Sequence, residues 1–184
     1  MNAILNESFP HGWRVEILTA RPLILPSRSF VYPVQAEEVE RGALELLVTP
    51  AVGTAFLATC ALGFRDPSAP TGVWACPHTD WLCALSGGYA YLINTANPAE
   101  FKHLAMQPVL SVNALPQHGL LLFAGHHSLL AWGAEGERWQ SDKLSWEGIT
   151  ITEISDSVIS GTGWDLMTDR DTIFTISPET GKRI

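Results

Sequence analysis

The stretch "LCALSGGYAYLINTANP" (residues 82–98) returns 38 residues later as "LLLFAGHHSLLAWGAEG" (residues 120–136). In both copies a run of apolar residues leads to a glycine, a second apolar run follows, and a polar turn ends the unit. Short apolar runs that are separated by glycine and polar residues are typical of β-hairpins. The repetition therefore predicts a series of antiparallel hairpins.

A third copy, "VISGTG" (158–163), matches the first two up to its last glycine. Gly87, Gly125 and Gly163 are then evenly spaced, and we expect each of them to mark a hairpin turn. The third copy continues with the longer segment "WDLMTDRD" (164–171) before the next apolar run. This period predicts an all-β fold of antiparallel meanders of about 38 residues, either a propeller of up to four blades or an open curved sheet or sandwich.

Residues that favour strands recur along the whole chain, whereas helical periodicity is rare. The expected strands are 13–18, 43–48, 54–62, 81–85, 89–94, 108–115, 119–124, 128–132, 149–154 and 172–177. The two helix candidates are "AEEVERG" (36–42), which would end at its glycine, and "NPAEFKHL" (97–104), which begins with an asparagine cap followed by proline.

The length of 184 residues suits one all-β domain over 1–184. We expect residues 43–184 to hold the repeated meanders and residues 1–42 to supply N-terminal strands. The last repeat stops before its third segment, so its edge would be open. A strand such as 13–18 is a candidate to complete that repeat and cover the edge.

The composition narrows the classes of partner. Charged residues are 16% of the chain and the formal net charge is −8, which would repel a nucleic-acid backbone. The longest uncharged stretch, residues 46–64, contains Pro50 and Gly53 and so favours buried strands over a membrane-spanning helix. The N-terminus lacks signal-peptide features, and the 3 cysteines are an odd number without a metal-binding spacing. We therefore expect a cytoplasmic protein without a nucleic-acid or membrane partner.

Two stretches of the repeat region, "LLLFAGHHSLLAWGAEGERW" (120–139) and "DTIFTISPETGKRI" (171–184), resemble the blade repeats of WD-like and PQQ-like β-propellers. The resemblance covers residues 82–184 and implies the architecture; no set of residues matches a quinone site, and no cofactor is expected. The whole chain also resembles an uncharacterised family of short, single-domain bacterial proteins. That resemblance implies a bacterial, cytoplasmic protein and no particular activity.

The favoured function is a non-catalytic module that binds a protein or a small molecule. The segment 164–171 is inserted relative to the other units, and inserted loops on a repeated scaffold commonly carry binding sites. Tryptophans beside glycine and acidic residues at strand ends are plausible contacts for a partner. The candidate binding residues are Trp164, Asp165, Asp169, Asp171 and Trp146.

The alternative function is a metal-assisted hydrolase. Adjacent residues of a strand point to opposite faces, so His126 and His127 would not hold one metal ion together. A zinc site would need one of them together with His118, or with His78 and Asp80. A third hypothesis is a structural subunit that forms a homo-oligomer by pairing an exposed sheet edge with another chain.

Overall fold

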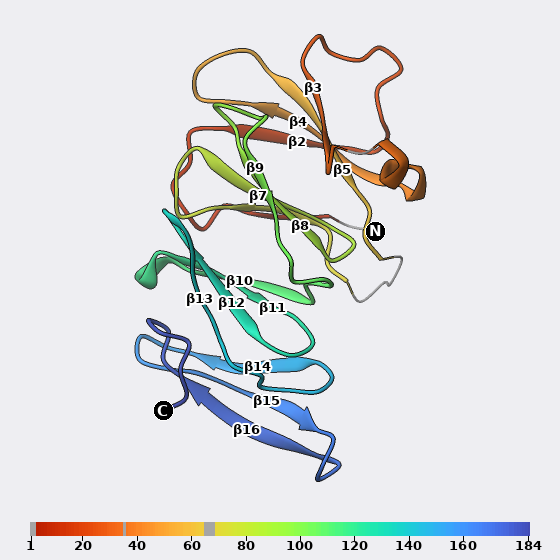
Figure 1. Ribbon diagram of the computed structural model, residues 1–184. Coiled ribbons are helices and arrows are strands. Elements are labelled where there is room, and N and C mark those ends of the chain that lie inside the picture. Colours follow the sequence, from red (N-terminus) through yellow and green to blue (C-terminus); the bar gives the residue numbers. More distant parts are fainter. Residues whose placement is uncertain (1–2, 35, 65–68) are drawn as a thin grey trace. The chain divides into compact units, whose positions relative to one another are not determined.

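The structure is a computed structural model, which describes residues 3–34, 36–64 and 69–184. These residues contain no α-helix; strands are joined by turns and by two short 3-10 helices, η1 (Ala36–Arg41) and η2 (Pro116–His118). The strands form four separate sheets, none of which closes into a barrel within the described part of the chain (Figure 1). The all-β prediction is confirmed. The chain divides into two compact units, Met1–Pro108 and Val109–Ile184.

The first unit holds two sheets. One sheet has, in spatial order, the strands β2 (Arg14–Leu18), β4 (Ala43–Thr49), β5 (Phe56–Ala61) and β3 (Ser29–Tyr32). The other has β1 (Ile4–Asn6), β6 (Gly72–Ala75), β7 (Trp81–Ser86), β8 (Tyr89–Asn94) and β9 (Phe101–His103). β1 pairs with β6 in parallel and β3 with β5 in parallel, whereas the other pairs are antiparallel.

The second unit holds the other two sheets. The larger sheet has the strands β10 (Ser111–Leu115), β11 (Leu120–Ala124), β12 (Leu129–Gly133) and β13 (Gly136–Gln140). The smaller sheet has β14 (Ile149–Ile154), β15 (Ile159–Asp165) and β16 (Arg170–Ile176). Every strand pair of this unit is antiparallel, and consecutive strands are neighbours, as a meander requires.

All four sheets share one arrangement. Each contains three neighbouring antiparallel strands, and three of the sheets add a fourth strand, β3, β9 or β13, beside the third. The smaller sheet of the second unit has only an isolated bridge at that position, between Ile176 and Arg183. Repeated antiparallel meanders are thus confirmed, and the last of them differs from the others in its outer edge.

The N-terminal strands belong to the first unit. Residues 14–18 form β2, which pairs with β4 from Arg14 opposite Thr49 to Leu18 opposite Glu45, and not with a strand of the last repeat. This pairing covers the side of β4 that faces away from β5, so that neither side of β4 stays an open edge. The single domain over residues 1–184 stays a prediction.

The glycine turns agree with the prediction at two of the three positions. Gly87 and Gly88 connect β7 to β8 with φ values of 55° and 80°, the positive range that a two-residue hairpin needs. Gly125 likewise lies between β11 and β12. Gly163 was expected to mark a turn but lies inside β15, opposite Ile149 and Thr172. A Cβ there would collide with the segment that crosses this strand, which explains the glycine without a turn.

The predicted helix over residues 97–104 is wrong. For residues 36–42, only the predicted end of the helix at the glycine is correct. Residues 36–41 form a 3-10 helix rather than an α-helix, and it ends at Gly42, whose φ is 117°. Residues 97–104 contain no helix. Glu100 donates its N–H to the Asn97 carbonyl in a turn, and Phe101 then begins β9 opposite Ile93. Pairing of β9 with β8 thus outweighs the local helix-cap signal at Asn97.

Two buried tyrosines connect the sheets of the first unit. The Tyr32 hydroxyl donates to the Pro98 carbonyl over 2.7 Å, and the Tyr91 hydroxyl donates to the Ala61 carbonyl over 3.0 Å. Burial raises the pKa of Tyr32 well above its ordinary value, so its proton stays available for this bond. Satisfied polar groups of this kind specify how the two sheets pack.

The three cysteines, Cys60, Cys76 and Cys83, are free thiols and lie in the same unit. Each is 0% exposed, and burial raises each thiol pKa well above its ordinary value. Free thiols that are buried in this way pack as small hydrophobic residues.

The two sheets of the second unit pack around one core. Its members come from both sheets and from the segment between them: Leu115, Leu120, Leu122, Ala124, Leu129, Ala131, Trp139, Leu144, Ile159, Phe174 and Ile176, with Ile149 and Ile151 at its border. In β16 the buried residues alternate with exposed ones, so Phe174 faces this core while Ile173, which is 77% exposed, faces outward.

Candidate functional site

A segment that follows β13 crosses the end of the last sheet and carries Trp146. The Leu144 N–H donates to the His127 carbonyl over 2.7 Å, and the Trp146 N–H donates to the Trp164 carbonyl over 2.8 Å. The Ser145 hydroxyl also donates to the Trp164 carbonyl, over 3.3 Å. Leu144 and Ser145 are buried. These bonds hold the exposed Trp146 beside β15.

Trp146 and Trp164 line one pocket with a volume of about 190 Å³, which we call the tryptophan pocket. Its lining residues are Lys143, Leu144, Ser145, Trp146, Trp164, Asp165, Thr172 and Arg183. The structure therefore brings three of the predicted binding residues together, namely Trp146, Trp164 and Asp165. Pockets for drug-sized ligands have volumes of roughly 300–1,000 Å³, so this one has room for about one side chain.

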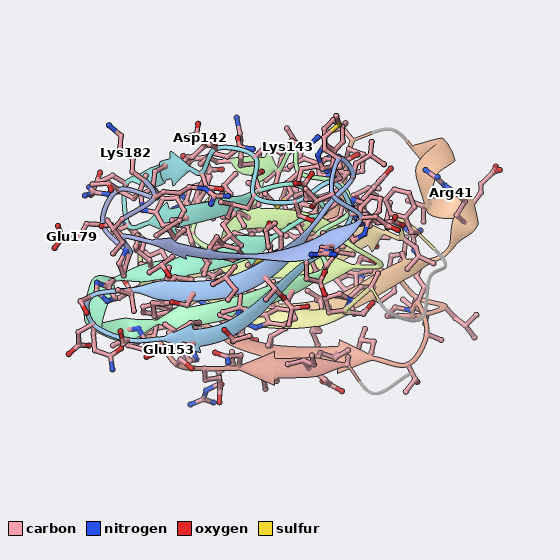
Figure 2. The ribbon with its side chains drawn as sticks, turned by 90° about the horizontal axis from the view of Figure 1, so that it is seen from below. Arg41, Asp142, Lys143, Glu153, Glu179 and Lys182 are labelled. Atoms are coloured by element: carbon pink, nitrogen blue, oxygen red, sulfur yellow. The ribbon has the colours of Figure 1, made fainter. Side chains whose placement is uncertain are left out.

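Two cationic side chains border the pocket. The Lys143 ammonium lies 2.8 Å from the centroid of the Trp146 ring, and Trp146 is 44% exposed. Arg183 reaches the pocket from the residues after β16. Among the described residues, neither Lys143 nor Arg183 forms an ion pair. Figure 2 shows Lys143 and Glu153 on opposite sides of the second unit, so the acidic Glu153 does not offset these charges.

Half of the segment 164–171 is strand, which corrects the prediction of a long inserted loop. β15 continues to Asp165 and β16 begins at Arg170, so that only residues 166–169 form the turn. Both carboxylate oxygens of Asp165 accept hydrogen bonds in this turn, one from the Met167 N–H over 2.9 Å and one from the Thr168 hydroxyl over 3.2 Å. The Asp165 carboxylate thus stabilises the turn at the rim of the pocket.

Asp169 and Asp171 lie outside the tryptophan pocket. Asp169 occupies the turn with a φ of 50°, a left-handed conformation that aspartate tolerates better than most residues. Asp171 lies in β16, directly opposite Trp164 on the neighbouring strand. Both are exposed, so they remain available to a partner that extends beyond the pocket.

The predicted metal ligands do not gather. In the described ranges, no group of three or more histidine, cysteine, aspartate or glutamate side chains is placed to hold a metal ion. The rings of His126 and His127 have centroids 6.1 Å apart, and His127 Nδ1 donates to the Ser145 carbonyl over 3.2 Å. His127 therefore supports the segment that carries Trp146.

The other predicted ligands serve different turns. His78 Nδ1 accepts the Asp80 N–H over 3.2 Å in the turn between β6 and β7. His118 ends η2 and borders a separate cavity of about 460 Å³, into which Arg138 and Glu179 also project. Both His118 Nε2 and His126 Nδ1 are enclosed without a hydrogen-bond partner in the part of the chain that is described.

Sequence reasoning missed the contributions of Lys143, Ser145 and Arg183 to the site. Lys143 and Ser145 lie in a connection without periodicity, and Arg183 lies beyond the last expected strand. A groove of about 510 Å³ along β14, lined in part by Ser111 and Asn113, was missed as well. It contains no aromatic residue, and for that reason we regard the tryptophan pocket as the better candidate site.

Comparison with known proteins adds little to this description. No protein-family model matches the chain, and no curated protein matches it. Among solved structures, the N-terminal domain of Nup159 aligns with 100% of this chain at a TM-score of 0.40 and 13% sequence identity. This chain spans about half, 53%, of that one. We draw no functional conclusion from so distant a likeness.

No helix in the described ranges is long and apolar enough to cross a membrane.

Proposed function

We propose that this protein is a non-catalytic binding module and that the tryptophan pocket is the centre of its binding surface. The observation that carries the proposal is that Trp146, which was singled out separately from Trp164 and Asp165, meets both of them around one pocket. A partly exposed tryptophan that is held by buried hydrogen bonds resembles the rigid aromatic anchors that dominate the energy of protein interfaces.

The size and charge of the pocket support a partner side chain as the ligand. A volume of about 190 Å³ is too small for most cofactors but suits one inserted side chain. Lys143 and Arg183 are cationic, whereas the Asp165 carboxylate is already engaged by its own turn. The unshared positive charge favours an acidic side chain from the partner, because a carboxylate would pair with both cations. The formal net charge of −8 makes this a local exception on an acidic protein.

The test is quantitative capture of binding proteins from an extract of the source cells, with the purified chain as bait. The Trp146→Ala variant should lose the proteins that the unchanged chain retains. The matched control is Val52→Ala, which truncates an apolar side chain that is 87% exposed and lies in the first unit. The control should retain those proteins. If Trp146→Ala and Val52→Ala both retain the full set, the tryptophan pocket is not the binding surface.

A further inference from the structure

We infer that the second unit has a further site, which binds a small zwitterion of the amino-acid class, with one carboxylate and one ammonium group. The site is the cavity of about 460 Å³ that His118 borders, which we call the polar cavity. Its lining residues are Gln117, His118, Leu120, Arg138, Glu179 and Thr180. It shares no lining residue with the tryptophan pocket, and Figure 2 shows Glu179 apart from Lys143. The inference thus goes beyond the proposed function.

The volume and the lining of the polar cavity suit a small hydrophilic molecule. Sites for small molecules have volumes of roughly 300–1,000 Å³, a range that includes this cavity but not the tryptophan pocket. Of its lining residues only Leu120 is apolar, and Leu120 is 5% exposed. A ligand would displace water from the polar lining residues, so it needs polar groups of its own to replace the lost hydrogen bonds.

Two opposite charges border the polar cavity without pairing. In the part of the chain that the structure describes, neither Arg138 nor Glu179 forms an ion pair. A zwitterion can form a charge-assisted hydrogen bond with each of them, through its carboxylate to Arg138 and through its ammonium group to Glu179. A simple anion would meet the like charge of Glu179, and a simple cation would meet that of Arg138. The pair of charges therefore favours a ligand that carries both.

The stem of Arg138 is held by close packing on Gly133. A Cβ atom added at Gly133 would lie 2.8 Å from Cγ and 3.1 Å from Cδ of Arg138, so a side chain there would displace the arginine. The same Cβ atom would lie 3.7 Å from Leu120, which also lines the polar cavity. Arg138 is thus partly ordered before a ligand arrives, which lowers the entropy cost of binding.

The turn that carries Glu179 and Thr180 is fixed against β13. The Trp139 indole N–H donates to the Pro178 carbonyl over 2.9 Å. The Thr180 hydroxyl accepts the Lys182 N–H over 3.4 Å, so its own proton remains available to a ligand. This turn therefore adds a hydroxyl donor next to the Glu179 carboxylate.

The segment after this turn leads away from the polar cavity. Arg183 lies opposite Ile176 in antiparallel order, and the Ile184 N–H donates to the Thr175 carbonyl over 3.1 Å. The segment thus runs back along β16, whereas Glu179 belongs to the turn that follows this strand. The cavity is formed by turns inside the chain.

Another wall of the polar cavity is the short helix η2. The Gly119 N–H donates to the Pro116 carbonyl over 3.1 Å, and Gly119 ends the helix with a φ of 60°. This turn presents Gln117 and His118 to the cavity. His118 Nε2 is enclosed without a hydrogen-bond partner among the described groups, a cost that a polar ligand can offset. The Gln117 amide can donate to or accept from the same ligand.

The test uses L-alanine and glycylglycine, two zwitterions of different length. Each is compared with its N-acetylated form, which lacks the ammonium group, and with its C-terminal amide, which lacks the carboxylate. The measurement is NMR titration of the complete protein, followed at the backbone amides of Gly119, Arg138 and Thr180. We expect saturable shifts with at least one zwitterion, and binding weaker by about tenfold or more for its two single-charge forms.

Two outcomes of the titration would overturn the inference. One is the absence of saturable shifts with either zwitterion up to about 50 mM. The other is a single-charge form that binds as tightly as its zwitterion, because the second charge of the cavity would then play no part.

Substitutions locate the binding site. Arg138→Gln and Glu179→Gln should each weaken binding of the zwitterion by about tenfold, since each removes one charge pair. Both side chains are exposed, so the fold should persist in both variants. The matched control is Glu137→Gln, which neutralises an exposed carboxylate of β13 that does not line the cavity. If all three variants bind alike, the polar cavity is not the site.

Two exchanged experiments separate this inference from the proposed function. Trp146→Ala should leave binding of the zwitterion unchanged, and Arg138→Gln should retain the captured proteins. Loss of zwitterion binding in Trp146→Ala would place the ligand at the tryptophan pocket and refute the assignment to the polar cavity. Failure of the capture experiment would refute the proposed function and leave the titration result as it stands.

Discussion

In the second unit, β12 lies between β11 and β13, whereas its counterpart β16 has a neighbour on one side and only the bridge to Arg183 on the other. The two sheets otherwise share their strand order and one core. The only member of that core in β13 is Trp139, and three residues of this strand are exposed. A fourth strand is thus held largely by backbone pairing and contributes little to the core. The comparison separates the side chains that form the core from the backbone pairing that extends a sheet.

The largest effect should come from Phe174→Ala. Phe174 is 2% exposed in the core that both sheets share, so its truncation should cost about 3–5 kcal/mol of the free energy of unfolding. The measurement is urea denaturation followed by tryptophan fluorescence. The neighbouring Ile173→Ala is the control, and its effect should stay within about 0.5 kcal/mol because Ile173 faces outward. Equal losses for both variants would contradict the assignment of the two faces.

A smaller loss should follow from Trp139→Phe, which tests the connection between β13 and the residues after β16. The Trp139 indole N–H donates to the Pro178 carbonyl over 2.9 Å, and its removal leaves that buried carbonyl unsatisfied at a cost of about 1–2 kcal/mol. Amide exchange at Gly181 and Ile184 should become faster, because this bond helps to hold the segment against the edge. Unchanged exchange at both amides would mean that β13 and the bridge are independent.

Ser145→Ala should cost about 1 kcal/mol and also loosen the tryptophan pocket. The Ser145 hydroxyl bonds to the Trp164 carbonyl and accepts the Glu147 N–H over 3.1 Å, so its loss frees the segment on either side of Trp146. Acrylamide quenching of tryptophan fluorescence should increase. Ser141→Ala is the matched control. The buried Ser141 hydroxyl accepts the Leu129 N–H over 3.0 Å, and Ser141 does not line the pocket. A similar rise in quenching for both variants would count against a local role.

The smallest effect on stability, within about 0.5 kcal/mol, should come from Ile173→Lys. Lysine on an open edge opposes pairing with other strands, so concentrated protein should scatter less light on storage. Val52→Lys introduces the same charge at a site that is 87% exposed in the first unit and should leave the scattering unchanged. Equal improvement by both substitutions would attribute the effect to net charge instead of the edge.

Several strands of the hairpins were predictable from the sequence because apolar or β-branched runs are bounded by turn residues. β8 and β14 coincide with their predicted ranges, 89–94 and 149–154, since apolar or β-branched runs end there at turn residues. The fourth strands were not predictable. β9 and β13 contain mostly polar residues. They are strands because they pair with a neighbouring strand, and a local sequence pattern carries no information about that pairing.

The candidate site was predicted in part, but the residues that were predicted correctly lie together for a different reason from the one given in the sequence analysis. Trp164 and Asp165 drew attention as part of an inserted loop, yet they end a strand, and Trp146 joins them through the Trp164 carbonyl. The prediction of a turn at Gly163 was wrong because glycine is favoured in turns and also in strands that another segment approaches closely. Its neighbour here is the backbone of Leu144, which is distant in sequence. The bacterial, cytoplasmic and protein-binding expectations stay predictions.

The buried thiols of the first unit allow the rate at which this unit opens to be measured chemically. Cys60, Cys76 and Cys83 are 0% exposed, and their raised pKa values leave almost no reactive thiolate in the folded chain. A thiol reagent can modify them only while the first unit is open, so the rate of modification counts its openings. The second unit contains no cysteine and is silent in this reaction. Thiol modification thus reports the opening rate of the first unit alone, whereas tryptophan fluorescence reports unfolding of both units.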